Sequence, residues 1–332
     1  MKILFAIQGT GNGHLSRARD VYPELAKHGD VDVLISGIQG DVKVPFPVKY
    51  TRYGMSFIFG KHGGVDIWDT AKKMKLFRLL RDIRTFPIEQ YDLVVNDFEP
   101  ISAWAAKRKK VPCVSLSHQY AVLHPAAPRP AENDLMGRLV LQRYAPVIAG
   151  YGFHFKAYGE HIYTPVIRQE IRDLTPTNKG HYTVYLPAYS DETIVKHLSR
   201  FPEARWQVFS KHNSEPFTTG NVTINKIDNR AFIESMAACA GVLCGAGFEG
   251  PAEAMHLGKK VLVVPMLAQY EQQCNAAGAV SMGAAVIKTL DTPHYDVIRR
   301  WLADGQPIQA NYPDMTADIV AQLIRTHGPR TK

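Results

Sequence analysis

The sequence predicts an α/β protein that contains two Rossmann-like domains in succession. Short apolar segments of strand length alternate with amphipathic segments of helix length, once before and once after residues 156–163. The chain has 332 residues, which is long enough for two separate hydrophobic cores. We therefore expect a first domain over residues 1–157 and a second domain over residues 158–332.

The composition is that of a folded globular protein, with 45% hydrophobic and 21% charged residues. The longest apolar runs have the length of a strand and the sequence begins with one, so we expect neither a signal peptide nor a transmembrane helix. The four cysteines lie in apolar surroundings without C-x-x-C spacing, which indicates reduced core thiols of a cytoplasmic protein and no metal site. The net charge of +8 favours anionic partners, among them nucleotides, acidic lipid headgroups and nucleic acid, without choosing between them.

The first strand, over residues 2–8, leads into a glycine-rich loop that ends in His14 and a helix over 15–27. A dinucleotide-binding loop requires Gly or Ala where His14 stands and an acid at the end of the next strand, whereas Asp32 lies inside the strand predicted over 31–36. This argues against a nicotinamide cofactor. A neutral imidazole at the mouth of a parallel sheet is a natural proton acceptor near pH 7, although His14 could equally only line the cleft.

Residues 48–59 indicate one or two irregular strands, and residues 68–85 a basic, apolar helix. Six Lys and Arg side chains alternate there with Met, Leu, Phe and Ile. One interpretation is a helix that rests on an anionic membrane surface. The other is a surface helix whose apolar stripe packs on the sheet and whose basic residues are solvated.

The next strand, over residues 92–96, ends at Asp97, and a helix follows to residue 109. Acids at the ends of parallel strands point into the cleft, which makes Asp97 a candidate site residue. The alternative is that Asp97 or Glu99 caps the following helix. A strand over 111–118, a proline-rich loop, a helix over 132–144 and a strand over 147–155 complete the first series.

The second series begins with strands over 183–186, 206–210 and 222–224 and helices over 191–200 and 230–238. A strand over 241–244 then enters the small residues from Gly245, and a short helix follows, with Pro251 in its first turn and Gly258 at its end. The open backbone and positive end of such a helix favour a phosphate. Glu253 lies inside this helix, where a carboxylate can accept both hydroxyls of a ribose.

The next strand, over residues 260–264, ends at Pro265 and leads to an acid and an amide side by side, Glu271 and Gln272. The chain then gives a helix, a short strand over 284–287 and helices over 294–303 and 314–326.

At these residues the sequence resembles the GT-B glycosyltransferases, both the bacterial peptidoglycan N-acetylglucosaminyltransferases and the UDP-dependent glycosyltransferases. The spacing from Glu253 to Gly258 is similar to that of their ribose-binding helix, and the run from Glu271 to Ala276 to the segment that holds donor-sugar hydroxyls. Both motifs align with the family pattern without an insertion or deletion between them. The resemblance implies two Rossmann-like domains that face each other across a cleft, with the last helix crossing back to the first domain.

The resemblance assigns the donor half to the second domain. It places Glu253 on the ribose, Glu271 and Gln272 on the sugar, and the diphosphate on the backbone of one loop. The donor-binding set it implies is Ser210, Ile227, Gly245, Ala246, Gly247, Phe248, Glu249, Gly250, Glu253, Glu271 and Gln272. Within this set Ser210 faces the phosphates and Ile227 contacts uracil through its backbone. Gly245 stands where the signature of the plant UDP-dependent glycosyltransferases begins with a His, and Glu249 is unusual beside a phosphate. Backbone contacts to the phosphates are therefore expected there instead of side-chain contacts.

The resemblance assigns the acceptor half to the first domain. It makes His14 the base that takes the proton from an acceptor hydroxyl and Asp97 the acid that orients it. The loop that positions the acceptor contains Gly11, Asn12 and Gly13, with His118 beside the cleft; His118 and His124 are secondary candidates for the base.

The reaction it implies is inverting and metal-independent transfer of a hexose or N-acetylhexosamine from a nucleotide-diphosphate sugar, with UDP favoured, to an acceptor hydroxyl. No cofactor is expected. A lipid or a cell-envelope compound is a candidate for the acceptor, and residues 68–85 would contact the inner face of the membrane. One alternative is a nucleotide-sugar 2-epimerase, which shares the donor half. The other is a non-catalytic binder of nucleotide sugars or nucleic acid, but no aromatic stacking platform for nucleic acid accompanies the basic residues.

Overall fold

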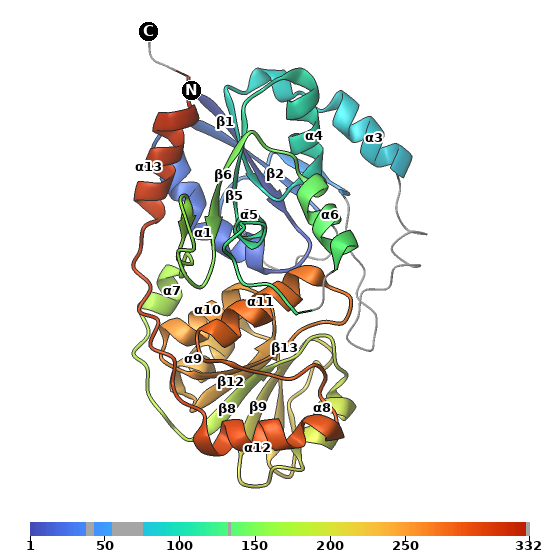
Figure 1. Cartoon of the computed structure of the whole chain (residues 1–332), viewed down its shortest axis with the longest axis vertical. Helices are drawn as coiled ribbons and strands as arrows, with labels where there is room; N and C mark the ends of the chain where they lie inside the picture. Colours follow the sequence, from blue (N-terminus) through green and yellow to red (C-terminus); the bar gives the residue numbers. More distant parts are fainter. Residues whose placement is uncertain (38–42, 55–75, 132–133, 330–332) are drawn as a thin grey trace.

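The protein is described by a computed structural model that covers residues 1–37, 43–54, 76–131 and 134–329. Two sheets of seven strands lie one above the other, each flanked by helices (Figure 1). The predicted α/β class with two Rossmann-like series is confirmed.

The first sheet is parallel throughout and is buried on both faces. Its strands are β1 (Lys2–Gln8), β2 (Asp30–Ser36), β3 (Tyr50–Arg52), β4 (Leu93–Asp97), β5 (Cys113–Ser117), β6 (Ala149–Phe153) and β7 (Ile162–Tyr163), in the order β3-β2-β1-β4-β5-β6-β7. Alternate residues of β1 enter different cores, with Phe5 on one side and Leu4 on the other. This explains the continuous apolar runs, because parallel strands covered by helices on both faces have no solvated side.

The helices of the first domain begin with α1 (Gly13–Ala26), α3 (Leu76–Thr85), the short η1 (Ile88–Gln90) and α4 (Pro100–Lys109), followed by α5 (His118–Val122) and α6 (Leu135–Tyr144). Of the helix predicted over 68–85, residues 68–75 lie outside the described residues, as do residues 55–59 of the strand predicted over 48–59. The strand predicted over 111–118 is three residues too long, two at its start and one at its end. Ser117 caps α5 by accepting a hydrogen bond from the backbone N–H of Tyr120, so His118 begins a helix.

The first sheet continues past residue 157, since β7 pairs with β6. Residues 164–180, which include α7 (Gln169–Arg172), then carry the chain to the second sheet.

The second sheet is parallel except for one edge strand. Its strands are β8 (His181–Tyr185), β9 (Arg205–Ser210), β10 (Phe217–Thr219), β11 (Val222–Lys226), β12 (Gly241–Gly245), β13 (Lys260–Val264) and β14 (Ala285–Val286), in the order β10-β11-β9-β8-β12-β13-β14, with β10 antiparallel to β11. Its helices are α8 (Asp191–Leu198), α9 (Asn229–Ala238), α10 (Glu249–His256), α11 (Tyr270–Ser281), η2 (Thr292–His294) and α12 (Tyr295–Asp304).

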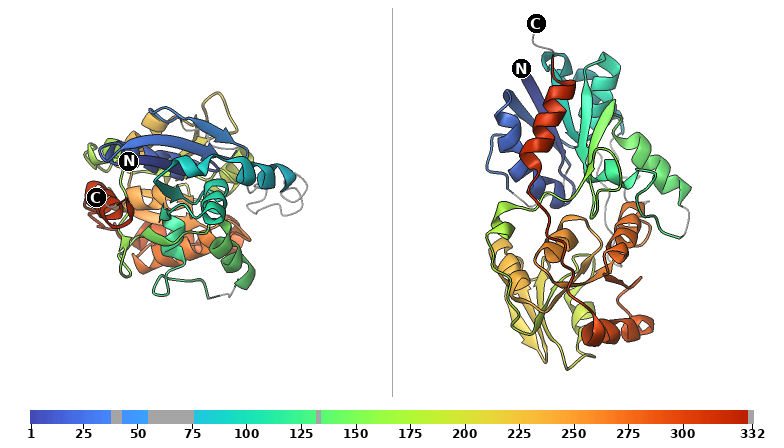
Figure 2. Two further views of the ribbon diagram at one scale, coloured as in Figure 1. Left: turned by 90° about the horizontal axis from the view of Figure 1, so that it is seen from above. Right: turned by 60° about the vertical axis from the view of Figure 1, so that its left-hand side comes forward.

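The last helix, α13 (Thr316–His327), returns to the first domain and lies against α1 (Figure 2). Its buried apolar side chains, Leu323 among them, belong to the same core as the β1 side chain Phe5. The start of β1 and the end of α13 therefore lie at the same end of the molecule (Figure 1).

The two sheets direct the carboxyl ends of their central strands toward each other. Helix α11 packs against α5 and α6, and α1 contacts α10. A small apolar cluster crosses this boundary, with Val122 and Leu141 from the first domain and Tyr270 and Cys274 from the second. We call this boundary between the domains the seam. Among the described residues, none of the helices has both the length and the apolar character that crossing a bilayer requires.

Candidate active site

His14 and Asp97 meet at the seam. His14 lies in the first turn of α1 and Asp97 ends β4, the neighbour of β1, so two parallel strands bring them together. The Nδ1 atom of His14 lies 2.9 Å from Oδ1 of Asp97. The adjacent acid, Glu99, caps α4 by accepting hydrogen bonds from the N–H groups of Ile101 and Ser102. The two acids thus have separate roles, one in the site and one in the helix.

A third member of this group, Arg17, was not predicted from the sequence. Its Nη2 donates to both oxygens of Asp97, at 2.7 and 2.8 Å, and lies 3.2 Å from Nδ1 of His14. Its Nη1 donates to Glu249 of the second domain. The available signal was the spacing of His14 and Arg17, since residues three apart share a face of a helix.

Burial and charge act against each other on these groups. Burial lowers the pKa of His14, but the charge of Asp97 and its hydrogen bond outweigh it and leave the pKa raised above 6.5, against a smaller opposing effect of Arg17. Burial raises the pKa of Asp97, but Arg17 and His14 outweigh this and hold it below its usual range. Asp97 is therefore a carboxylate at neutral pH, as an acid that orients a histidine must be.

The loop before α1 lies directly against the second domain. Gly11 has a φ of 84°, which a residue with a side chain rarely adopts, and Asn12 occupies the N-cap position of α1. A side chain at Gly13 would collide with the Glu249 carboxylate. The residues of this loop and the start of α10 are therefore brought together.

The predicted phosphate loop follows β12, with Gly245 as the last residue of the strand and Glu249 as the first of α10. Beside Gly247 and Gly250 there is open space where side chains would otherwise lie. Ala246 is buried, and its carbonyl accepts a hydrogen bond from the Asn275 side chain at 3.1 Å. The backbone is thus accessible at the two glycines, as an anion at a helix N-terminus requires.

Glu253, the predicted ribose residue, is paired with an arginine of the segment between the sheets. It is 3% exposed, and its two oxygens accept from Nε and Nη2 of Arg168 at 2.5 and 2.9 Å. Arg168 also donates to Glu170 and Asn229. Sequence reasoning missed this partner because 85 residues separate Arg168 from Glu253.

Glu271 and Gln272, the predicted sugar residues, lie in the first turns of α11. Oε1 of Glu271 accepts from Nε2 of Gln119 at 3.1 Å, and that nitrogen lies 3.3 Å from Nε2 of His14. Oε1 of Gln272 accepts from the backbone N–H of Met266 at 2.9 Å. Gln119, which was not predicted, therefore bridges the acid predicted to bind the sugar and the candidate base.

The second candidate base, His118, is buried in the seam. Its Nδ1 lies 2.7 Å from the Phe153 carbonyl, its Nε2 lies 2.6 Å from Oδ1 of Asn275, and its ring stacks on Phe248 at 3.8 Å. Burial lowers its pKa. His118 links the two domains through Asn275, and because its pKa is lowered while that of His14 is raised, it is less suited than His14 to receive a proton. His124 faces Gly159 of the same domain.

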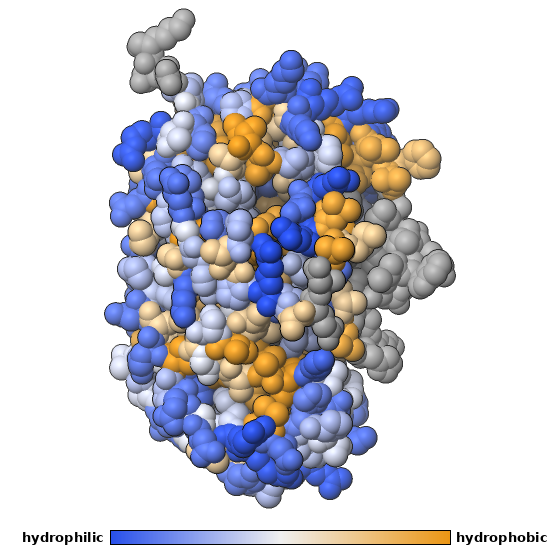
Figure 3. All heavy atoms as spheres, in the orientation of Figure 1, coloured by the Kyte–Doolittle hydropathy of each residue, from blue (hydrophilic) through white to orange (hydrophobic). Residues whose placement is uncertain are grey.

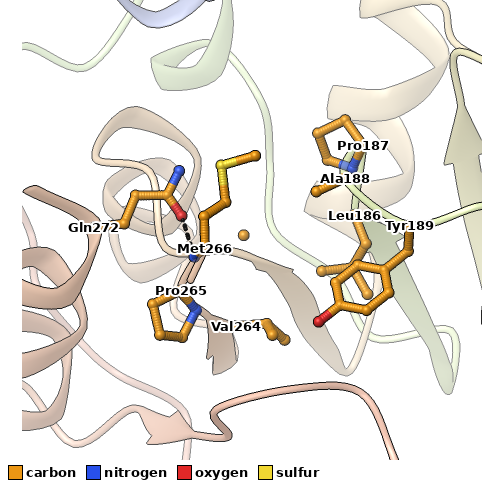
Figure 4. A pocket seen from close by; sticks show the side chains of 9 residues that line it. Leu186, Pro187, Ala188, Tyr189, Val264, Pro265, Met266 and Gln272 are labelled. Atoms are coloured by element: carbon orange, nitrogen blue, oxygen red, sulfur yellow. Dashed lines mark hydrogen bonds between the residues drawn. The ribbon is translucent and has the colours of Figure 1, made fainter. Parts of the chain in front are cut away.

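The remaining donor residues lie farther along the second sheet. Ser210 ends β9, and its carbonyl accepts the N–H of Ile227 at 2.9 Å, so this backbone donor of Ile227 is already used. A small pocket opens at the ends of β8, β12 and β13 (Figure 4). It is lined by the loop after β8, from Leu186 to Tyr189, by Gly245 and by the Val264 to Met266 segment with Gln272. Gly245 and Gln272, both predicted to bind the donor, share this pocket.

The family model for glycosyl transferase family 1 matches residues 1–303. The chain belongs to this family. It is a glycosyltransferase whose reaction is glycosyl transfer from a nucleotide sugar, and the family predicted from the Glu253 and Glu271 motifs is confirmed. No curated protein matches the chain.

Solved structures show the fold of this glycosyltransferase. It is similar to SsfS6, a Streptomyces sp. SF2575 glycosyltransferase in complex with thymidine diphosphate, at 16% identity and a TM-score of 0.58 over 98% of this chain and 99% of that one. It is similar to MurG of Acinetobacter baumannii at 16% identity and a TM-score of 0.57, over 98% and 100% of the two chains. A UDP-N-acetylglucosamine 2-epimerase matches at 14% identity and a TM-score of 0.57, over 98% and 96%. These likenesses establish the two-domain GT-B fold.

The ion pair of Arg168 and Glu253 generates a stability prediction. Arg168→Met removes the cation and leaves the Glu253 carboxylate buried and unpaired, which costs roughly 3–5 kcal/mol in the free energy of unfolding. Urea denaturation followed by far-UV circular dichroism measures it. Arg168→Met combined with Glu253→Gln should recover much of the loss, because the unpaired charge is gone.

Arg230→Met is the matched control, since Arg230 pairs with Glu234 in the solvent and should be close to wild type. If Arg168→Met is no more destabilising than Arg230→Met, the buried pair does not have this structural role.

Proposed function

We propose that this glycosyltransferase inverts the anomeric centre of a nucleotide-diphosphate sugar, with His14 as the base. The observation that carries this proposal is the contact of His14 Nδ1 with Asp97 at 2.9 Å, which leaves Nε2 directed to the seam and 3.3 Å from Gln119. If Nδ1 donates its hydrogen to Asp97, Nε2 keeps its lone pair. A base with an orienting acid is the arrangement that activates a hydroxyl.

The proposed step is a single displacement. The acceptor oxygen forms a bond to the anomeric carbon while the bond from that carbon to the diphosphate oxygen breaks, and the diphosphate leaves with the electron pair. The acceptor proton passes to Nε2 of His14, and the Asp97 carboxylate stabilises the imidazolium that results. No further reactant is needed for the balance of atoms and charge.

We propose that the donor occupies the second domain. The diphosphate would lie at the start of α10, where Gly247 and Gly250 leave room beside the backbone, and the helix dipole would stabilise the leaving group. The Glu249 carboxylate at this helix start is paired with Arg17, which reduces its repulsion of a diphosphate. These groups support a reaction without a metal ion, as the sequence resemblance implies.

The ribose assignment of Glu253 is compatible with its ion pair. Each carboxylate oxygen has two acceptor sites, so Glu253 can accept a ribose hydroxyl while Arg168 holds its orientation. The nucleotide we favour is UDP, on the basis of the sequence resemblance. The thymidine diphosphate bound to SsfS6 supports a pyrimidine nucleotide more generally.

We further propose a lipid or cell-envelope acceptor reached from the cytoplasmic face of a membrane. Helices α3 and α6 expose apolar side chains on one side of the first domain, where orange spheres gather in Figure 3. Phe77 is 91% exposed and Met136 is 70% exposed, and basic residues such as Arg78 and Arg81 accompany them. An exposed surface of this composition fits an anionic bilayer.

The likeness to a UDP-N-acetylglucosamine 2-epimerase supports one second candidate, because an epimerase uses the same donor half without an acceptor. Incubation with UDP-N-acetylglucosamine alone separates the two. Formation of the epimer would favour this second candidate, whereas a transferase needs an acceptor for turnover.

A thermal-shift panel of UDP-, dTDP- and GDP-sugars tests the donor assignment, since a ligand that binds only the native state raises the melting temperature. We expect the UDP sugars to give the largest shift. A protein stabilised by none of them would not be a nucleotide-sugar enzyme of the proposed kind.

The base assignment predicts the effect of two substitutions. With the best donor of that panel, His14→Ala should reduce turnover by roughly 10²–10⁴, the usual contribution of a general base. Asp97→Asn should lose much of the same factor. The double variant should be little worse than the worse single one, because the two residues act as a unit. Release of the nucleoside diphosphate measures turnover, and an unchanged Kd for the nucleotide shows that the donor half is intact.

The same assignment predicts the pH dependence. Because the pKa of His14 is raised above 6.5, the base is neutral only above that higher value, so kcat/KM should fall on the acid side with a midpoint above pH 6.5. Asp97→Asn removes the anion that raises this pKa, and the midpoint should move to lower pH. Retention of most activity by His14→Ala together with its loss in His118→Ala would transfer the role of base to His118.

A further inference from the structure

Gln119 occupies a central place that the reaction outlined above leaves unexplained. It lies in the first turn of α5, is 3% exposed, and stands where the two domains meet. Its side chain reaches the candidate base His14 on one side and the sugar-binding candidate Glu271 on the other.

The neighbours of Gln119 fix the direction of its amide. Nε2 donates to Oε1 of Glu271 at 3.1 Å and lies 3.3 Å from Nε2 of His14. The opposite orientation would place the amide oxygen against the Glu271 carboxylate, which can only accept. Nε2 of His14 is then the acceptor of the second amide hydrogen, in agreement with a hydrogen on Nδ1 facing Asp97.

The amide oxygen is left over. Throughout the described part of the chain, no donor forms a hydrogen bond to Oε1 of Gln119, although the atom is buried. A buried acceptor without a partner is costly and uncommon, and at a substrate site it indicates a group that a ligand completes. A sugar hydroxyl is a donor of the right kind, because Glu271 next to it is itself an expected ligand of sugar hydroxyls.

We propose that Gln119 is a donor-sugar contact supplied by the first domain, a proposal that rests on the donor assignment made above. Its Oε1 accepts a hydrogen bond from a hydroxyl of the transferred sugar that lies beside the hydroxyl held by Glu271. Its Nε2 donates a hydrogen bond to Nε2 of His14 until the acceptor hydroxyl takes the place of this donor. The preferred donor therefore has a hydroxylated sugar at this point, and a deoxy sugar would leave the buried oxygen unpaired.

Binding titrations of nucleotide sugars against their free nucleotides test this role. The probes are UDP-glucose, UDP-N-acetylglucosamine, dTDP-glucose and GDP-mannose, each compared with UDP, dTDP or GDP. In the wild type we expect at least one sugar nucleotide to bind more tightly than its nucleotide. Gln119→Leu should leave the Kd of the nucleotide unchanged and weaken the sugar nucleotide by about tenfold, as expected for one buried hydrogen bond.

Gln119→Glu provides a second variant of similar volume. It keeps an acceptor at Oε1 but removes the amide hydrogens and adds a negative charge beside His14, so the acid-side midpoint of kcat/KM should move to higher pH. Gln306→Leu, which changes an exposed glutamine in the segment after α12, is the matched control and should resemble the wild type in both measurements.

The outcomes separate the two proposals. If the wild type binds none of the nucleotides or sugar nucleotides, the proposed function fails and the role of Gln119 fails with it. If the nucleotides bind but the folded Gln119→Leu variant keeps the full gain in affinity from the sugar, Gln119 is not a sugar contact and the donor assignment stands.

Discussion

The geometry of the site depends on the ion pairs that the buried guanidinium of Arg17 forms. Arg17 is 2% exposed, and its partners are Asp97 of the first domain and Glu249 of the second. Removing a charge from water costs several kcal/mol, and only well-placed partners offset this cost. The position of α1 relative to α10 is thereby restricted, and the candidate base is held next to the helix where the diphosphate is proposed to bind.

Two further contacts at the seam also join polar side chains of the two domains. Asn275 meets His118, and Gln119 meets Glu271, so each connects an expected donor segment to the first domain. Apolar packing crosses the boundary as well, since the core that contains Phe5 also includes Phe248 and Met255 of the second domain. In an enzyme whose substrates enter between two rigid bodies, we expect these polar contacts to break when the domains open.

Much of the fold could be predicted from the sequence because it depends on local patterns. Continuous apolar runs such as residues 3–7 are typical of strands buried on both faces, and Pro251 and Gly258 mark the ends of a helix wherever it packs. The contact of His14 with Asp97 could also be predicted, since both lie at the carboxyl ends of neighbouring parallel strands. The start of α5 was missed, because a strand and a helix meet there without a glycine or proline between them.

The partners of the site residues were not predictable in the same way. No sequence motif contains Arg17, Gln119 or Arg168. Their contacts form only when segments that are distant in the sequence fold together. Local sequence gives the type of a side chain and its face on an element. The cost of burying a charge, and therefore the choice of its partner, is decided by tertiary structure.

The stereochemistry of the transferred sugar tests the single displacement at His14 most directly. An α-linked nucleotide sugar with a suitable acceptor can be followed by proton NMR, and the coupling of the anomeric proton in the first product formed gives its configuration. We expect the β configuration, because the acceptor oxygen attacks from the face opposite the diphosphate. An α-linked first product would contradict this mechanism, since retention requires a different path in which His14 and Asp97 do not act as one base.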